Sequence, residues 1–348
     1  KGVEKMLYER DEFGFFEKVI TIHPYTKKTR KIELDKKNII FEFSNDFFPF
    51  SKYFFVRIFQ RIFYFPRVLY HIIKIIKSEK IDIIRATDPY IIGFYALLAS
   101  IITKIPFCIS IHSDYFQRHK LDKIFGSPKI IGSRILAELL EKFVIKNTDL
   151  LLPIRETLAE NYCKLGVNPN KIHIIPHGID LSIFLTHPKN YLRKKYQIPP
   201  SKKIISFVGR ITRENYIYDI ILIAEKILQV RKDVIFVIAG EGVEFENLKN
   251  EINGNELQKQ FLLIGFISNN DASELRKISY INLCLMGGYS LIEACAAGRP
   301  VISYDVEWHS ELVRNKETGF LVQEGKIDTV AESILYLLKN PNIANKLG

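Results

Sequence analysis

Short runs of β-branched and other apolar residues alternate with longer helical stretches along this sequence, and the alternation occurs twice. Such a pattern predicts parallel strands joined by crossover helices. In the first half, strands are expected at residues 19–22, 39–43, 81–85, 107–111, 150–153 and 172–175. After Gly178 the pattern begins again, with strands expected at residues 204–208, 234–239, 261–264, 281–284, 301–304 and 320–322. The sequence therefore predicts an α/β protein with two Rossmann-like, doubly wound lobes that face a cleft.

The length of the chain supports the same division, because 348 residues are too many for one ordinary core and suit two domains. Residues 185–202 are rich in Pro, Lys and Tyr and have no clear period, as expected of a linker with a short helix. We place the boundary near residue 180, which gives lobes at residues 1–180 and 181–348. The sequence begins at Lys1 and ends at Gly348 inside a predicted helix, so we expect that it lacks both natural ends.

The composition is that of a folded protein, with 47% hydrophobic and 26% charged residues. The net charge of +11 favours anionic partners, which could be nucleic acid, acidic lipid headgroups or the phosphates of a small donor. The four cysteines lack the spacing of a zinc site and are expected to be reduced core thiols. No uncharged stretch is longer than residues 89–103, which are fewer than the roughly 20 residues of a membrane span. With no visible signal peptide, a cytoplasmic location is expected.

Two loops at the predicted carboxyl ends of strands could bind phosphate. Gly209 ends a strand and is followed by Arg210, whose guanidinium could donate two hydrogen bonds to phosphate oxygens. A surface arginine after a turn is the equally weighted alternative. The run GGYSLIEA at residues 287–294 follows a strand and opens a helix, which makes its free amides an anion site. Glu293 could accept hydrogen bonds from a ribose diol, and a capping or surface glutamate is the alternative.

Other motifs are weaker. Gly240 and Gly242 resemble the start of a dinucleotide fingerprint, but Phe245 stands where the third glycine belongs, which disfavours a dehydrogenase. His112 follows an apolar strand and could donate to a sugar hydroxyl, or it could be a strand-end histidine bonded to backbone. No two aspartates are separated by a single residue, so the metal-chelating acid pair of some transferases is absent.

Aromatic residues are interleaved with basic residues between positions 47 and 70. Such a stretch suits a membrane interface or a buried packing helix, and these two interpretations have equal weight. Stacking on nucleic acid is a minor third possibility, because no RNA-binding motif accompanies the patch.

Taken together, the motifs of the second half resemble those of the family 4 retaining glycosyltransferases. They are IPHGID at 175–180, VGR at 208–210, AGEG at 239–242, IGF at 264–266, SLIEA at 290–294, GRPVI at 298–302 and ETGFLV at 317–322. In the first half the resemblance is weaker and depends on strand order and on His112.

The resemblance implies a GT-B fold, in which an N-terminal acceptor-side lobe faces a C-terminal lobe that binds a nucleotide diphosphate sugar. It also implies retention of anomeric configuration and no required metal or other cofactor. The basic, aromatic first half suits a glycan or lipid-linked acceptor at an anionic membrane surface, and no nucleic acid partner is expected. The donor would be bound by Gly209, Arg210, Arg213, Gly240, Gly242, Phe266, Gly287, Gly288, Tyr289, Ser290, Leu291 and Glu293, and His112 and Arg210 would be catalytic.

Two positions depart from the family pattern. Leu285 stands where a glutamate usually contacts the sugar, and Asn215 stands where a lysine usually neutralises phosphate. Arg213 could replace that lysine. The family's first strand would precede Gly2 and is expected to be missing. A nucleotide-sugar binder without catalytic activity is therefore a rival interpretation. A second rival is a nucleic-acid-binding protein, because the chain is basic.

Overall fold

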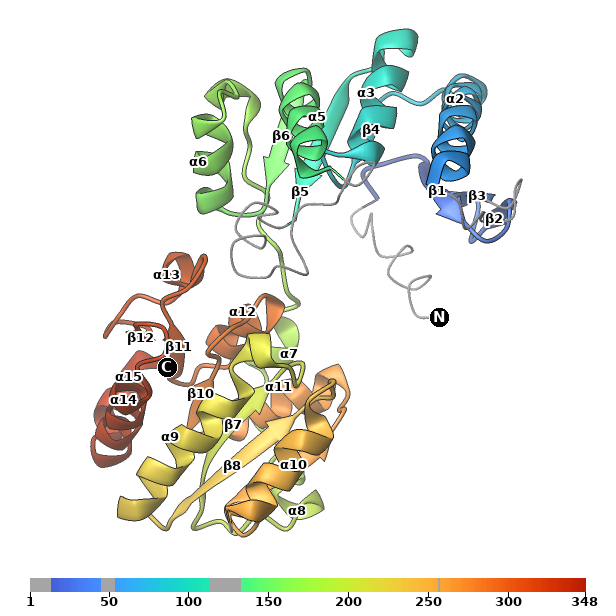
Figure 1. Ribbon diagram of the computed structural model, residues 1–348. Coiled ribbons are helices and arrows are strands. Elements are labelled where there is room, and N and C mark those ends of the chain that lie inside the picture. The colour runs from blue at the N-terminus through green and yellow to red at the C-terminus, as the bar shows by residue number, and fades with distance from the viewer. Residues whose placement is uncertain (1–13, 45–53, 113–132, 256) are drawn as a thin grey trace. The chain divides into compact units, whose positions relative to one another are not determined.

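The computed structural model describes residues 14–44, 54–112, 133–255 and 257–348, without the side chains of residues 54–63. The chain divides into two compact units, Lys1–Pro176 and His177–Gly348. The division falls after Pro176, close to the boundary expected near residue 180. Figure 1 shows the helices and strands of each unit.

The first unit contains two three-stranded sheets, ordered β1-β3-β2 and β4-β5-β6. The strands are β1 (Val19–Thr26), β2 (Arg30–Glu33), β3 (Asn38–Ser44), β4 (Ile84–Ala86), β5 (Phe107–Ile111) and β6 (Leu150–Pro153). The helices are α2 (Phe54–Ser78), α3 (Ile91–Thr103), α5 (Arg134–Lys146) and α6 (Glu156–Lys164). Apolar residues of α2 and α3 pack beside the first sheet, and β5 and β6 share a core with α5 and α6.

Two details of this unit differ from the sequence prediction. β2 was not predicted, and it pairs antiparallel with β3. Its sequence RKIE has only one apolar residue, so it carries no apolar run. The strand expected at residues 172–175 forms only an isolated bridge between Ile172 and Leu151. Residues 173–175 are exposed, so an apolar run here does not indicate a buried strand.

The second unit contains one six-stranded sheet in the order β12-β11-β10-β7-β8-β9, and each adjacent pair is parallel. The strands are β7 (Lys203–Val208), β8 (Val234–Ala239), β9 (Phe261–Gly265), β10 (Ile281–Leu283), β11 (Val301–Tyr304) and β12 (Gly319–Val322). The helices are α7 (Ser182–Leu185), α8 (Tyr191–Lys195), α9 (Ile217–Val230), α10 (Phe245–Gly254), α11 (Asn269–Ile278), α12 (Tyr289–Ala296), α13 (His309–Leu312), α14 (Ile327–Lys339) and α15 (Pro341–Leu347). Every strand predicted for this half is present.

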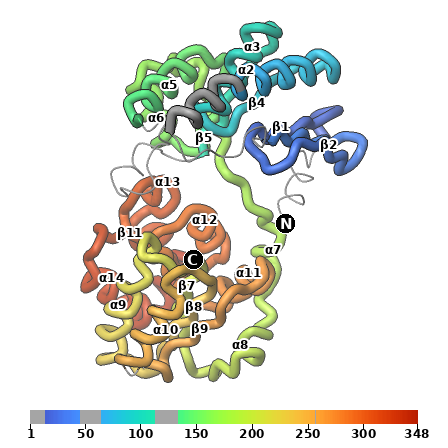
Figure 2. The backbone as a smooth tube through the Cα atoms, turned by 45° about the vertical axis from the view of Figure 1, so that its right-hand side comes forward, coloured from blue at the N-terminus to red at the C-terminus, as the bar shows by residue number. Residues whose placement is uncertain are grey.

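Helices cover both faces of this sheet. One core joins the strands to α9, α10, α14 and α15. A second core, on the other face, joins them to α8 and α11. Figures 1 and 2 show α9 and α10 on one side of β7 and β8, and α8 and α11 on the other. The layers are those of a doubly wound Rossmann-like domain.

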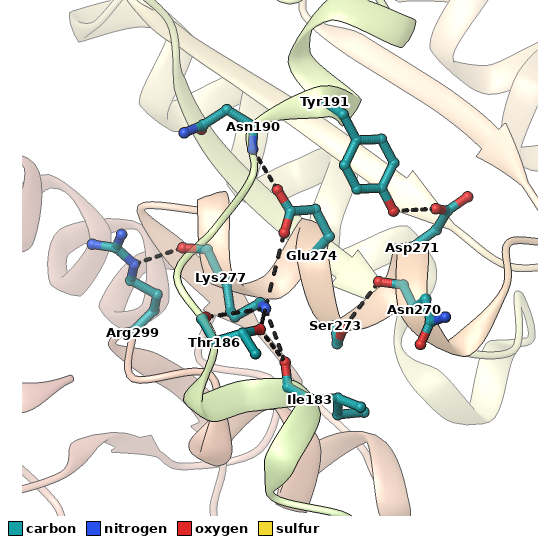
Figure 3. Close-up of polar contacts among 10 residues, drawn as sticks. All are labelled: Ile183, Thr186, Asn190, Tyr191, Asn270, Asp271, Ser273, Glu274, Lys277 and Arg299. Carbon is teal, nitrogen blue, oxygen red and sulfur yellow. Dashed lines mark hydrogen bonds and ion pairs between the residues drawn. The ribbon is translucent and has the colours of Figure 1, made fainter.

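The segment at residues 185–202 has the short helix that the sequence predicts, but it is not a linker between the two units. It contains α8 and belongs to the second unit, where side chains of α11 bind its backbone (Figure 3). Leu192 and Ile198 are buried in the core that includes α11. The segment therefore lies packed against the second sheet's helical layer.

Candidate functional site

The strand order of the second unit locates a ligand crevice. From the central strand β7 the chain runs to β8 and β9 on one side, and then to β10, β11 and β12 on the other. The order therefore reverses between β7 and β10. In open α/β sheets, ligands bind outside the carboxyl ends of the strands at such a reversal. The loops after Val208 and after Leu283 flank this point.

The loop after β7 presents Arg210 to solvent. Among the described residues, the Arg210 side chain forms no ion pair, so its charge is available to a ligand. Its backbone carbonyl is bound twice, by the Asn215 side-chain amide at 2.6 Å and by the Thr212 backbone N–H at 3.1 Å. Asn215, which replaces a lysine, thus shapes the loop through the backbone of Arg210.

Gly240 and Gly242 allow two loops to run in close contact. The Gly209 N–H donates a hydrogen bond to the carbonyl oxygen of Ala239 at 3.0 Å, which continues the pairing of β7 with β8. A Cβ at Gly240 would lie 1.8 Å from the Gly209 carbonyl oxygen, and one at Gly242 would lie 2.1 Å from that of Ile211. Gly240 also has φ +135°, which side-chain-bearing residues rarely adopt. These glycines therefore support the Arg210 loop, and their predicted contact with the donor remains a prediction.

Arg213 has a partner of its own. Its Nε donates to Glu244 at 2.9 Å, and its guanidinium lies over the Tyr218 ring, 5.2 Å from the centroid. Hydrogen bonds from Asn247, Tyr218 and Arg213 lower the pKa of Glu244 to about 2. Arg213 is thus held by Glu244, and its replacement of the missing lysine remains a prediction.

The run after β10 combines exposed and buried residues. Gly288 and Tyr289 are exposed where α12 begins, and α12 has no side-chain cap on its first amides. The amides of Tyr289 and Ser290 precede the first intrahelical hydrogen bond, so they can bind an anion. Leu291 is buried in the core and its N–H donates to Gly288 at 3.2 Å, so its side chain packs and does not face a ligand.

Gly287 is held by a buried histidine that the sequence did not indicate. The His309 ring is fully buried. Its Nδ1 lies 2.6 Å from the Ser303 hydroxyl and 3.0 Å from the Tyr304 carbonyl oxygen, while Nε2 accepts from the Gly287 N–H at 3.3 Å. The Gly287 amide is therefore used internally, and the histidine links the end of β11 to the start of the glycine run.

Two aromatic side chains lie exposed near these loops. Tyr289 is 50% exposed, and its hydroxyl lies 2.9 Å from Nδ1 of His177. Phe266 follows β9 and is 76% exposed. The Gly240 N–H donates to Gly265 at 2.8 Å, which brings the backbone before Phe266 next to the glycine loop. Phe266 is thus available for the predicted contact with a base.

Glu293 lies on α12 and is paired with a buried arginine. Its Oε2 lies 3.1 Å from Nη2 of Arg276, and its side chain is 31% exposed. Arg276 is only 3% exposed, and its Nη2 also lies 3.4 Å from the carbonyl oxygens of Val208 and Ser290. Burial lowers the pKa of Arg276, and the charge of Glu293 opposes that shift. The alternative of a plain surface glutamate does not fit this contact.

In the first unit, His112 is exposed directly after β5. This is the carboxyl end of the central strand of the β4-β5-β6 sheet, as predicted. The role of His112 toward a transferred sugar remains a prediction.

Part of the aromatic run at residues 47–70 lies outside the described residues. In the described part, Phe65 stacks on Tyr95 with centroids 4.2 Å apart, and the Tyr64 hydroxyl donates to the Phe43 carbonyl at 3.1 Å. Arg67 and Tyr70 are exposed. The packing interpretation therefore holds for Tyr64 and Phe65, and the exposed face remains open to a membrane.

Two family models match the chain, and the two matches adjoin close to the boundary between the units. Residues 188–348 match the family described as Glycosyl transferases group 1, and residues 36–183 match Glycosyltransferase Family 4. The chain belongs to the family 4 glycosyltransferases. The resemblance seen in the motifs is confirmed.

Several bacterial glycosyltransferases have sequences similar to this chain. N-acetyl-alpha-D-glucosaminyl L-malate synthase of Bacillus anthracis is 25% identical over 63% of this chain and 58% of the relative. A 2-deoxystreptamine N-acetyl-D-glucosaminyltransferase of Niallia circulans is 30% identical over 42% of this chain and 39% of the relative. UDP-Gal:alpha-D-GlcNAc-diphosphoundecaprenol alpha-1,3-galactosyltransferase of Escherichia coli is 28% identical over 75% and 67%. The chain thus spans between 39% and 67% of these relatives' lengths.

Solved structures agree on the fold. Anabaena HepE in complex with UDP superposes with a TM-score of 0.67 at 15% identity, over 81% of this chain and 75% of that chain. Sucrose-phosphate synthase from Thermosynechococcus elongatus gives a TM-score of 0.69 at 18% identity, over 94% and 81%. The predicted GT-B class, with two Rossmann-like lobes, is confirmed.

The departures from the family pattern have structural consequences in this glycosyltransferase. Leu285 is fully buried in the core of the second unit that includes α9 and α14, so the leucine side chain packs internally and does not face a ligand. No group of three or more His, Cys, Asp or Glu side chains within the described ranges is arranged to hold a metal ion. In the same part of the chain, no helix has the length and apolarity to cross a membrane. The four cysteines are free thiols, of which Cys108 and Cys284 are buried.

Proposed function

We propose that this protein transfers a sugar from a nucleotide diphosphate donor to an acceptor, with retention of configuration and without a metal. The observation that carries the proposal is the meeting of three groups at the reversal between β7 and β10. They are the exposed Arg210, the uncapped first amides of α12, and Glu293 with one carboxylate oxygen bound by Arg276.

Each group suits one part of such a donor. As the sugar bond breaks, negative charge grows on the departing diphosphate, and a fixed guanidinium with helix amides stabilises that charge without reorganising. Arg210 and the start of α12 supply these donors. The Oε1 atom of Glu293 has no hydrogen-bond partner among the described residues, so it is free to accept hydrogen bonds from a ribose diol.

The names of related proteins support the donor and acceptor classes. HepE was solved with UDP and with UDP-glucose. The Escherichia coli relative is named for UDP-Gal and a diphosphoundecaprenol acceptor, and a Streptococcus pneumoniae relative is named alpha-monoglucosyldiacylglycerol synthase. A lipid-linked or glycan acceptor is therefore part of the proposal.

A nucleotide-sugar binder without turnover is the second candidate. Leu285 is buried where the family has a sugar-contacting glutamate, and Asn215 binds the Arg210 carbonyl where the family has a lysine. Both changes remove a charged group from the site, which would lower turnover more than binding.

A donor screen separates these candidates. The protein is incubated with UDP-, GDP-, ADP- and CDP-sugars, each with and without EDTA, and the released nucleoside diphosphate is measured. We expect release with one base, unchanged by EDTA, and a product whose anomeric proton has the donor's configuration by NMR. Binding without release would favour the silent binder. If no nucleotide or nucleotide sugar binds at millimolar concentration, the donor site is wrongly assigned.

The exposed face of α2 supports peripheral membrane contact as part of the proposal. Arg67, Tyr70, Lys74 and Lys77 are all exposed and follow helical spacing on this helix. Each basic side chain near an anionic surface contributes about 1 kcal/mol. We expect changing Arg67, Lys74 and Lys77 to Gln to release the protein from phosphatidylserine vesicles in a flotation assay. Equal binding of the unaltered protein to neutral and anionic vesicles would leave only the packing role.

A further inference from the structure

Helix α11 contains three charged side chains that are all buried. Glu274, Arg276 and Lys277 are 3%, 3% and 6% exposed. Burying an ionised group is costly unless it is paired and hydrogen-bonded. The partners of these three residues therefore show what the helix holds in place.

Two of them bind the segment that precedes and includes the start of α8. The Lys277 Nζ donates to the Ile183 carbonyl at 2.9 Å and to the Thr186 hydroxyl at 3.0 Å, and the Asn190 N–H donates to Glu274 at 2.6 Å (Figure 3). Figure 3 shows these side chains pointing from α11 toward that segment. They hold α11 against the backbone of the 183–190 segment.

Arg276 binds the donor loops instead. Its Nη2 lies 3.1 Å from Glu293 Oε2 and 3.4 Å from the carbonyl oxygens of Val208 and Ser290. Val208 immediately precedes Gly209 and Arg210, whereas Ser290 and Glu293 lie on α12. One guanidinium thus contacts both loops that flank the reversal between β7 and β10.

We propose that Arg276 is a positioning residue of the donor site, which holds Glu293 and the two flanking loops in the arrangement that binds a nucleoside diphosphate. The proposal rests on the proposed function of this site. Arg276 binds one oxygen of Glu293 and leaves the other for the ligand. Being buried, Arg276 does not touch the ligand itself and acts through Glu293 and the loop backbone.

The incomplete hydrogen bonding of Arg276 argues against a purely structural role. Its Nη1 is buried without a hydrogen-bond partner among the described residues. A buried ion pair often contributes no more stability than an apolar replacement, and an unpaired donor makes it less favourable still. Stability alone would therefore be served equally well by an apolar residue on α11.

A double-mutant cycle on ligand affinity tests the proposal. Dissociation constants for UDP, GDP, ADP and CDP are measured by calorimetry, and the tightest ligand is used for Arg276→Met, Glu293→Ala and the double variant. We expect each single change to weaken binding about 10-fold, because a hydrogen bond to a charged group is lost. The double variant should be weakened by clearly less than the product of the two single effects, since Arg276 acts partly through Glu293 and partly through the loop backbone.

Lys277→Met is the matched control, because it removes a neighbouring buried cation that binds the 183–186 segment. We expect it to lower the melting temperature but to leave affinity within twofold. If Arg276→Met behaves the same way, or weakens binding equally with and without Glu293, the positioning role is wrong.

Two further variants guard against loss of folding. Arg276→Lys keeps the charge but not the fork, so an intermediate affinity is expected. Arg276→Met combined with Glu293→Gln removes both charges and avoids an unpaired one. If the unaltered protein binds none of the four nucleotides, the proposed function fails, and crystal structures then test the positioning role. Displacement of residues 208–210 and Glu293 in Arg276→Met, but not in Lys277→Met, would support it, and unchanged loops would overturn it.

Discussion

Replacing Arg210 by alanine tests the site most directly. The side chain is exposed and forms no ion pair among the described residues, so its loss should change the free energy of unfolding by no more than about 0.5 kcal/mol. For a protein of this size that corresponds to a melting shift of about 2 °C or less. Turnover should fall far more. Removing one preorganised donor to a developing charge typically costs about 100- to 1000-fold in kcat, or about 2.7–4 kcal/mol.

The assay measures nucleoside diphosphate release with the donor found in the screen, together with a thermal melt. Arg231→Ala is the matched control, because Arg231 pairs with Asp233 before β8, at the opposite edge of the sheet. It should leave kcat unchanged. Arg210→Lys should recover part of the activity, because a point charge lacks the bidentate fork. Transfer by Arg210→Ala within threefold of the unaltered protein would refute the reasoning, and a larger loss in Arg213→Ala would move the diphosphate to Arg213.

Three further changes test the supporting structure. Gly240→Ala should lower the free energy of unfolding by about 1–3 kcal/mol in urea melts, because its Cβ would lie 1.8 Å from the Gly209 carbonyl oxygen. Gly254→Ala should not destabilise the protein, because the space around Gly254 is open. His309→Leu should lower the free energy of unfolding by about 1–3 kcal/mol, because it leaves buried polar groups unpaired. It should also weaken nucleotide binding, and unchanged affinity would show that the His309 ring does not hold the glycine loop in place. The pKa of Glu244 is lowered from 4.5 to about 2 in the folded state, so its contribution to stability is complete above about pH 4.5 and is lost as the pH falls toward 2. Glu244→Gln should therefore reduce the fall in melting temperature between pH 5 and pH 3, and an identical fall in both proteins would contradict the assignment.

The strands of the second unit could be predicted almost to the residue, because they are buried on both faces. β8 and β11 occupy residues 234–239 and 301–304, as predicted from their apolar runs. The antiparallel β2 could not be found in this way, since its sequence is mostly charged and its pairing partner β3 lies five residues further along the chain. Apolar content predicts buried strands, so it does not identify a strand whose side chains are exposed.

The exposed residues of the candidate site could also be predicted from the sequence, but the buried residues that hold them in place could not. Arg210 and the start of α12 follow directly from strand ends and glycines, which are local signals. The partner of Glu293 depends on which helix packs beside α12, and that is set by the tertiary structure. On a helix with so many polar residues, Arg276 reads as part of a solvated face. The same holds for His309, whose ring contacts both the glycine run and β11.

The burial of Glu274, Arg276 and Lys277 changes how substitutions in α11 should be interpreted. A helix with charges at these positions would ordinarily tolerate replacement, because surface substitutions rarely alter stability by more than about 0.5 kcal/mol. Here Glu274 and Lys277 bind the backbone of the 183–190 segment, whereas Arg276 binds the backbone of the donor loops. Loss of Lys277 or Glu274 should loosen the 183–190 segment, whereas loss of Arg276 should act on the donor loops. Substitutions within the ten residues of α11 should therefore distinguish loss of stability of the second unit from loss of its affinity for a nucleotide.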